Sequence, residues 1–199
     1  MLKVSNYRQR LIWWGGLCGI VGSVLTLVMV FVSTLMSPWF RWDTNALSEL
    51  GVGEVALLFN GAVIIGGVLH FLFAIGLREY LPREQLIKIG VAFVMLGSVS
   101  LSLVGLFTIS YPILHGIVAL GEFVLVPIGF ILIGWSATES RMKQLSIATG
   151  IAALIAILIL PIFLLVLPLQ VGFAVPEMIE GCIVAVWVVF MGTRLLRAR

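Results

Sequence analysis

The sequence contains little charge. Of 199 residues, 12 are Lys or Arg and 9 are Asp or Glu, so 11% are charged while 61% are hydrophobic. Soluble domains average about 25% charged and about 45–50% apolar residues. No globular core of this length hides so much apolar surface. The composition therefore excludes an ordinary soluble domain and predicts that a lipid bilayer solvates the chain.

Cysteine and histidine are scarce as well. The chain has two of each, and Cys18 and Cys182 lie in apolar runs without CxxC spacing or a neighbouring His. This pattern excludes a disulfide framework and the local zinc motifs. A zinc site would have to be assembled from separate elements, for example from His115, Glu177 and Glu180. We therefore predict no metal and no cofactor.

Six long apolar runs dominate the chain. They cover residues 11–36, 55–77, 86–109, 114–136, 145–167 and 175–192. Each is close to the ~20 residues that a helix needs to cross about 30 Å of hydrocarbon. Open strands would leave backbone amides unsatisfied in lipid, and barrel strands would be about half this length. The sequence predicts an all-α polytopic membrane protein, a six-transmembrane-helix bundle that forms one domain over residues 1–199.

Basic residues are confined to alternate connections between these runs. Eleven of the twelve lie before the first run, around the connection between the second and third runs, in the connection between the fourth and fifth, or after the sixth. Only Arg41 falls elsewhere. Because Lys and Arg are retained in the cytoplasm, we predict that both termini are cytoplasmic. The net charge of +3 then reflects topology, so we predict membrane lipids and not nucleic acid as partners. The sequence is also compatible with a homo-oligomer.

Residues 37–54 form the one long connection, on the side predicted to be outside. Its second half, Asn45-Ala-Leu-Ser-Glu-Leu-Gly51, predicts a short interfacial helix, with Trp39, Phe40 and Trp42 as anchors at the membrane surface. Long connections without structure of their own are uncommon and are often functional. We expect this loop to cap the outer mouth of the bundle.

This loop also carries a resemblance. Asn45-Ala-Leu-Ser-Glu-Leu-Gly51, followed by Asn60 near the start of the second run and His115 near the start of the fourth, resembles the signature of a six-pass prokaryotic family catalogued as domain of unknown function 998. The resemblance covers the whole chain and implies the six-helix layout in a prokaryotic cell membrane. It also marks Trp42, Asn45, Ser48, Asn60 and His115 as family-type positions. It implies no activity.

Ionisable residues inside the runs are costly, and each is a functional hypothesis. Glu122 follows His115 by nearly two helical turns, so both face one side, about 10 Å apart in depth. One interpretation is a polar cavity with Glu122 at its floor, converging with Asn60. The other is a neutral Glu122 that only bonds a neighbouring helix, for example through Ser98, Ser102 or Asn60. His70 has no evident partner and is typical of a buried structural histidine.

Acidic residues gather on the predicted outer side. Glu177 and Glu180 share a helix face, where they either favour the helix dipole or form a cation or amine site with His115. The ligand-cavity candidates are Trp42, Asn45, Ser48, Asn60, His115, Glu122, Glu177 and Glu180.

Function is less constrained than architecture. The favoured hypothesis is binding of a lipid, an amphiphile or a small cation in an outward-facing polar cavity. The alternatives are a membrane-embedded hydrolase or transferase acting on lipid head groups, a small proton-coupled transporter, and an accessory subunit without a ligand. No G-x-S-x-G, P-loop or dinucleotide-binding motif decides between them.

Small residues recur at helical spacing within the runs. Gly15, Gly19 and Ser23 form a ladder in the first run, and several glycines mark the second, third and fourth. Such positions let backbones approach closely, which favours helix association in lipid. We expect most of these glycines to serve packing alone.

Overall fold

A computed structural model describes residues 6–166 and 172–198 of the chain. Within this part of the chain there are six α-helices and one short 3-10 helix, and no strand. The elements are α1 (Asn6–Leu35), η1 (Leu47–Gly51), α2 (Ala56–Tyr80), α3 (Gln85–Leu106), α4 (Pro112–Ser136), α5 (Ser140–Val166) and α6 (Ala174–Arg197). All six helices are long and apolar enough to cross a membrane. The prediction of an all-α, six-helix membrane fold is confirmed.

The helices extend beyond several of the predicted spans. Helix α1 begins at Asn6 and α6 continues to Arg197, because polar residues at a membrane edge still form regular helix. The predicted end of the fifth span, residue 167, lies outside the described residues. In the long loop we predicted a helix over residues 45–51. The structure has a shorter 3-10 helix, Leu47–Gly51, which begins after Ala46. The Glu49 carboxylate accepts a 2.7 Å hydrogen bond from the Ala46 amide and fixes this start.

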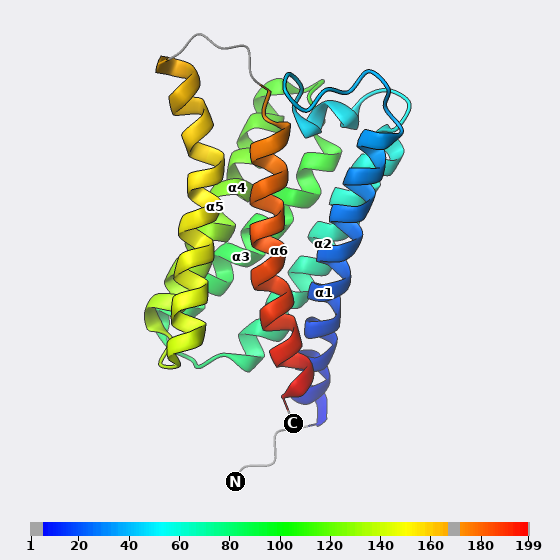
Figure 1. The fold of residues 1–199 in the computed structure, drawn as a ribbon. Helices are drawn as coiled ribbons and strands as arrows, with labels where there is room; N and C mark the ends of the chain where they lie inside the picture. The colour runs from blue at the N-terminus through cyan, green and yellow to red at the C-terminus, as the bar shows by residue number, and fades with distance from the viewer. Residues whose placement is uncertain (1–5, 167–171, 199) are drawn as a thin grey trace.

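The six helices form a ring in chain order. Each packs against the next along the chain, and α6 returns to pack against α1 (Figure 1). Helix α1 begins and helix α6 ends at one end of the bundle, called here the basic end because Arg78, Arg141 and Arg194 lie in its helix termini and turns. The opposite end, called the loop end, carries η1. At the loop end α5 leans away from α6 (Figure 1).

Glycines set the close helix contacts, as the sequence predicts. A Cβ atom at Gly15 of α1 would lie 2.7 Å from the Cα atom of Gly76 in α2. A Cβ atom at Gly90 of α3 would lie 2.8 Å from the Gly129 carbonyl oxygen of α4. Real side chains never tolerate such separations, so these backbones touch only because the side chains are absent.

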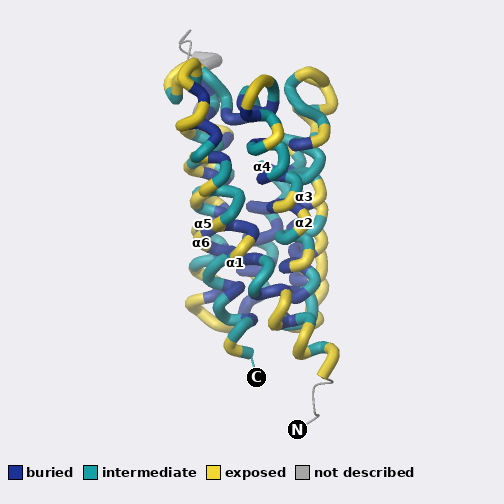
Figure 2. The backbone as a smooth tube through the Cα atoms, turned by 90° about the vertical axis from the view of Figure 1, so that its right-hand side faces the viewer, coloured by how far each residue is buried: buried dark blue, intermediate teal, exposed yellow. Residues whose placement is uncertain are grey.

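The main core fills the basic-end half of the ring. Its centre is Trp187, which is fully buried, stacks on Phe130 with ring centroids 3.9 Å apart, and meets Phe73 edge-on at 6.1 Å. The Trp187 indole nitrogen donates a 2.8 Å hydrogen bond to the hydroxyl of Ser146 in α5, so the polar part of this ring is satisfied. Buried residues line the interior of the bundle, and exposed ones lie on its outer faces and loops (Figure 2).

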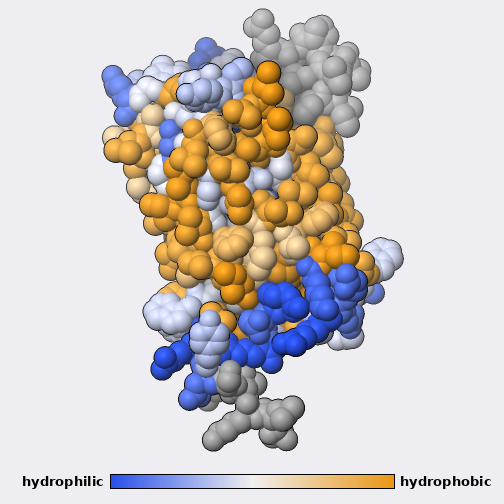
Figure 3. Space-filling view, turned by 180° about the vertical axis from the view of Figure 1, so that it is seen from behind, coloured by the Kyte–Doolittle hydropathy of each residue, from blue (hydrophilic) through white to orange (hydrophobic). Residues whose placement is uncertain are grey.

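The surface has the banding of a membrane protein. A wide hydrophobic band covers the face of the bundle seen in Figure 3, and hydrophilic side chains gather at the basic end. Among the described residues there, Arg8 of α1 pairs with Glu79 of α2, and Arg194 of α6 pairs with Glu139 in the turn between α4 and α5. The chain is therefore a multi-pass membrane protein whose basic residues lie outside the apolar belt.

Candidate functional site

A cavity of about 130 Å³ opens inside the loop-end half of the ring. Helices α1, α2, α3, α4 and α6 contribute to its wall, and η1 adds Leu47 and Ser48 at its loop end. Most of the wall is apolar, and its deepest part includes Phe73, which also belongs to the main core. The cavity thus lies between the short helix and the packed half of the bundle.

Three glutamates from two helices line this cavity. Glu122 comes from α4 and is 9% exposed, whereas Glu177 and Glu180 come from the first turns of α6, where Glu180 is 1% exposed. At 1.5 Å per residue, Glu180 lies about 9 Å along α6 from Ala174, and Glu122 about 15 Å along α4 from Pro112. Glu180 is within electrostatic range of both other carboxyl groups. The three side chains therefore form one acidic cluster at successive depths.

Two of these carboxyl groups differ in their hydrogen bonds. The Oε2 atom of Glu177 accepts a 2.6 Å bond from the backbone amide of Leu47, which attaches η1 to α6. The Oε1 atom of Glu180 is buried and has no hydrogen-bond partner among the described residues. Since an unsatisfied buried acceptor is destabilising, Glu180 is unusual for a purely structural residue.

His115 lines the cavity from the first turn of α4. Its Nδ1 atom lies 2.8 Å from the carbonyl oxygen of Phe107. A carbonyl only accepts hydrogen bonds, so Nδ1 carries a proton and donates it to Phe107. His115 adds a further polar side chain to a cavity that already holds three carboxyl groups.

His70 and Ser23 form a second polar group in the cavity wall, which the sequence did not reveal. The Oγ atom of Ser23 in α1 lies 3.0 Å from Nε2 of His70 in α2. Sequence inspection placed Ser23 only in a packing ladder and found no partner for His70. The antiparallel register of α1 and α2, in which Gly15 meets Gly76 and Gly22 meets His70, brings the two together.

The comparisons with known proteins decide the family. The model of the family described as Protein of unknown function (DUF998) matches residues 20–194. The chain belongs to this family. Neither the curated proteins nor the solved structures contain a significant match. The family resemblance seen in the loop motif is thus confirmed, and with DUF998 comes no assigned activity.

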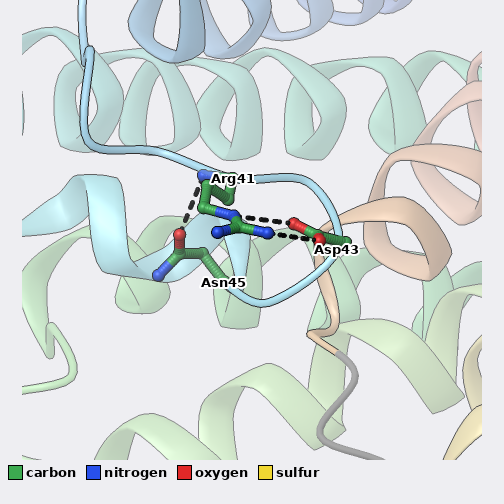
Figure 4. A network of polar contacts seen from close by, with 3 residues as sticks. All are labelled: Arg41, Asp43 and Asn45. Atoms are coloured by element: carbon green, nitrogen blue, oxygen red, sulfur yellow. Dashed lines mark hydrogen bonds and ion pairs between the residues drawn. The ribbon is translucent and has the colours of Figure 1, made fainter.

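The DUF998-type loop residues Trp42 and Asn45 do not line the cavity. Asn45 accepts a 2.8 Å bond from the Arg41 amide and donates one of 2.7 Å to Glu49, so it shapes the loop (Figure 4). Beside it, hydrogen bonds from the Arg41 side chain hold the pKa of the Asp43 carboxyl below its usual value. Trp42 packs with Phe40 against a small apolar cluster under the loop.

Asn60 also lies apart from the cavity, in contrast to the predicted convergence with Glu122. Its Nδ2 atom donates a 2.9 Å bond to the Gly51 carbonyl and so joins α2 to the end of η1. The hydroxyl groups considered as partners for Glu122 bond backbone carbonyls instead, Ser98 to Val94 and Ser102 to Ile64. Of the eight candidates, the cavity brings together Ser48, His115, Glu122, Glu177 and Glu180.

The cluster does not have the arrangement of a metal centre. Within residues 6–166 and 172–198, no group of three or more His, Cys, Asp or Glu side chains could hold a metal ion. The site can instead offer hydrogen-bond acceptors at one end and apolar walls along the rest.

Proposed function

We propose that this protein binds an amphiphilic molecule in the interhelical cavity, with the polar group of the ligand beside the glutamates and its apolar part between the helices. The observation that carries this proposal is the asymmetry of the cavity wall, in which the carboxyl groups of Glu122 and Glu177 lie near Glu180 while most of the remaining wall is apolar. An apolar pocket with a few convergent polar groups is the usual form of a small-molecule site.

The cavity volume restricts the ligand. A volume of about 130 Å³ resembles the roughly 150 Å³ apolar cavity that accommodates benzene in another protein. A head group and several carbon atoms fit, whereas a whole phospholipid does not. A longer chain would have to extend out of the cavity.

Binding can be tested on protein extracted from its own membrane. Native mass spectrometry should detect an amphiphile retained by the wild type. Replacing the cavity residue Ala119 with Phe fills the space and should abolish the retained mass. Ala92→Phe, on an exposed face of α3, is the matched control and should keep it. Equal retention by both variants would place the ligand outside the cavity and contradict the proposal.

The orientation of the site is part of the proposal. The distribution of Lys and Arg favours a cytoplasmic location for the basic end, and with it an outward-facing η1 and cavity in the cell membrane. In a variant with Cys18 and Cys182 replaced by Ala, an impermeant thiol reagent should label Thr44→Cys in intact cells and not Gln144→Cys. Both positions are exposed, at opposite ends of the bundle. The reverse labelling pattern would invert the orientation.

A second candidate function, acyl transfer, is favoured by the Ser23–His70 contact. In such a reaction the Ser23 oxygen would attack the carbonyl carbon of an ester while its proton passes to Nε2 of His70. The ester C–O bond would then break, the departing alcohol would take the proton from His70, and the acyl group would remain on Ser23. A fluorophosphonate that phosphonylates activated serines should then add its mass to the wild type but not to Ser23→Ala or His70→Ala. No added mass on the wild type would leave the hydrogen bond as a contact between α1 and α2.

A further inference from the structure

We propose that the head group recognised in the cavity is a protonated amine, so that the ligand is an organic monocation with an apolar tail. This inference rests on the proposed function and names the chemistry of its ligand. The ammonium group would lie among Glu122, Glu177 and Glu180, and the tail would follow the apolar wall toward Phe73.

The charge around the cavity favours a cation. Three carboxyl groups line it, and no Lys or Arg of the described chain does. No hydrogen bond joins any two of these carboxyl groups in that part of the chain, so they do not satisfy one another. Placing acidic side chains this deep in an apolar bundle is costly unless each finds a partner.

Hydrogen bonding gives a second, independent reason. The Oε1 atom of Glu180 is buried, lines the cavity with its side chain and lacks a donor in the described structure. A primary ammonium group supplies three N–H donors and a positive charge, which is what the carboxyl groups require.

The apolar wall favours an organic cation over a metal ion as the ligand. Calcium needs six to eight oxygen ligands and zinc usually four close ligands, and the described side chains form no such group. An alkyl amine instead satisfies both parts of the cavity, because its tail contacts the apolar wall while its nitrogen meets the carboxyl groups. A metal ion would leave that wall unused.

Octylamine, octanol and octanoate have tails of similar length and differ in charge, so they are suitable probes. Their binding to the full chain in phosphatidylcholine nanodiscs can be measured by titration calorimetry, with empty nanodiscs subtracted. Octylamine is protonated at neutral pH, since alkyl amines titrate near the lysine value of about 10.4. We expect octylamine to bind at least about tenfold more tightly than octanol, and octanoate not to bind.

Substitution at the acidic cluster then locates the head group. Glu180→Gln should weaken octylamine binding at least about tenfold and change octanol binding less than twofold. Glu54→Gln removes an exposed carboxylate at the same end of the bundle and should change neither. If Glu180→Gln does not fold, Glu122→Gln serves in its place. The comparison of the three probes on the wild type does not depend on either variant.

The outcomes separate the two proposals. Equal binding of octylamine and octanol, or full amine binding by the Gln variants, would overturn the amine head group and leave amphiphile binding intact. Failure of all three probes to bind would contradict both. Displacement of octylamine by stoichiometric calcium or zinc would also overturn the inference, since it would show that the cluster holds a metal ion.

Discussion

The two halves of this bundle are built differently. In the basic-end half, large side chains such as Trp187 and Phe130 fill the ring, and the indole nitrogen has its hydrogen-bond partner. In the loop-end half the same ring encloses a cavity, and Glu180 presents a buried oxygen without a partner among the described residues. The buried polar groups of the basic-end half therefore have hydrogen-bond partners, whereas the loop-end half keeps an acceptor without one among the described residues.

This difference indicates a division of labour. A close-packed core gives the ring a rigid base, and sites that hold ligands are commonly less stable than the scaffold that carries them. In the loop-end half, specific hydrogen bonds attach η1 to the helices instead, such as those from Leu47 to Glu177 and from Asn60 to Gly51. We therefore expect substitutions in the basic-end half to change stability and those around the cavity to change binding.

The largest expected loss of stability is at Trp187. Trp187→Ala removes the central ring and leaves a void, so the free energy of unfolding in mixed micelles should fall by about 3–5 kcal/mol. Trp135→Ala is the matched control, because Trp135 is 68% exposed on the outside of α4 and its loss should change stability little. A similar loss in both variants would mean that the aromatic core does not hold the ring together.

A smaller loss is expected where helices touch through glycine. Gly15→Ala places a Cβ atom 2.7 Å from Gly76, so α1 and α2 must separate and unfolding should become easier by about 1–3 kcal/mol. A Cβ atom at Gly116 meets nothing within 4 Å, so Gly116→Ala should be neutral or slightly stabilising. Unfolding curves of the two variants in the same micelles provide the comparison.

The smallest effect concerns the ion pair at the basic end. Hydrogen bonds from Arg194, one of them 2.7 Å long, lower the pKa of the Glu139 carboxyl. A lowered pKa means that the pair stabilises the fold at neutral pH and loses this contribution as the pH falls through the folded-state value. The small stability difference between wild type and Glu139→Gln should therefore shrink below about pH 4.5. A difference that grows on acidification would contradict the assignment.

The sequence predicted the features that lipid imposes along the chain. Run lengths and basic residues are local properties, so the spans and the shared end of the two termini could be inferred before the structure. The approach of Ser23 to His70 could not, because it depends on the register of two helices. The same holds for Asn60, which the sequence assigned to the cavity and which bonds Gly51.

The glutamates show where prediction succeeds in part. Its presence in an apolar run marked Glu122 as a functional hypothesis, and helical periodicity placed Glu177 and Glu180 on one face. That α4 and α6 direct these side chains into one cavity follows from the closure of the ring, which no local pattern specifies.

The most direct test of the central claim is to measure stability and octylamine binding together in Glu180→Met. If Glu180 serves a ligand, removing a buried carboxyl with an unsatisfied oxygen should raise the free energy of unfolding by about 1–3 kcal/mol. The same change should weaken octylamine binding at least tenfold. A less stable variant that binds octylamine as the wild type does would show that Glu180 is structural and would contradict the account.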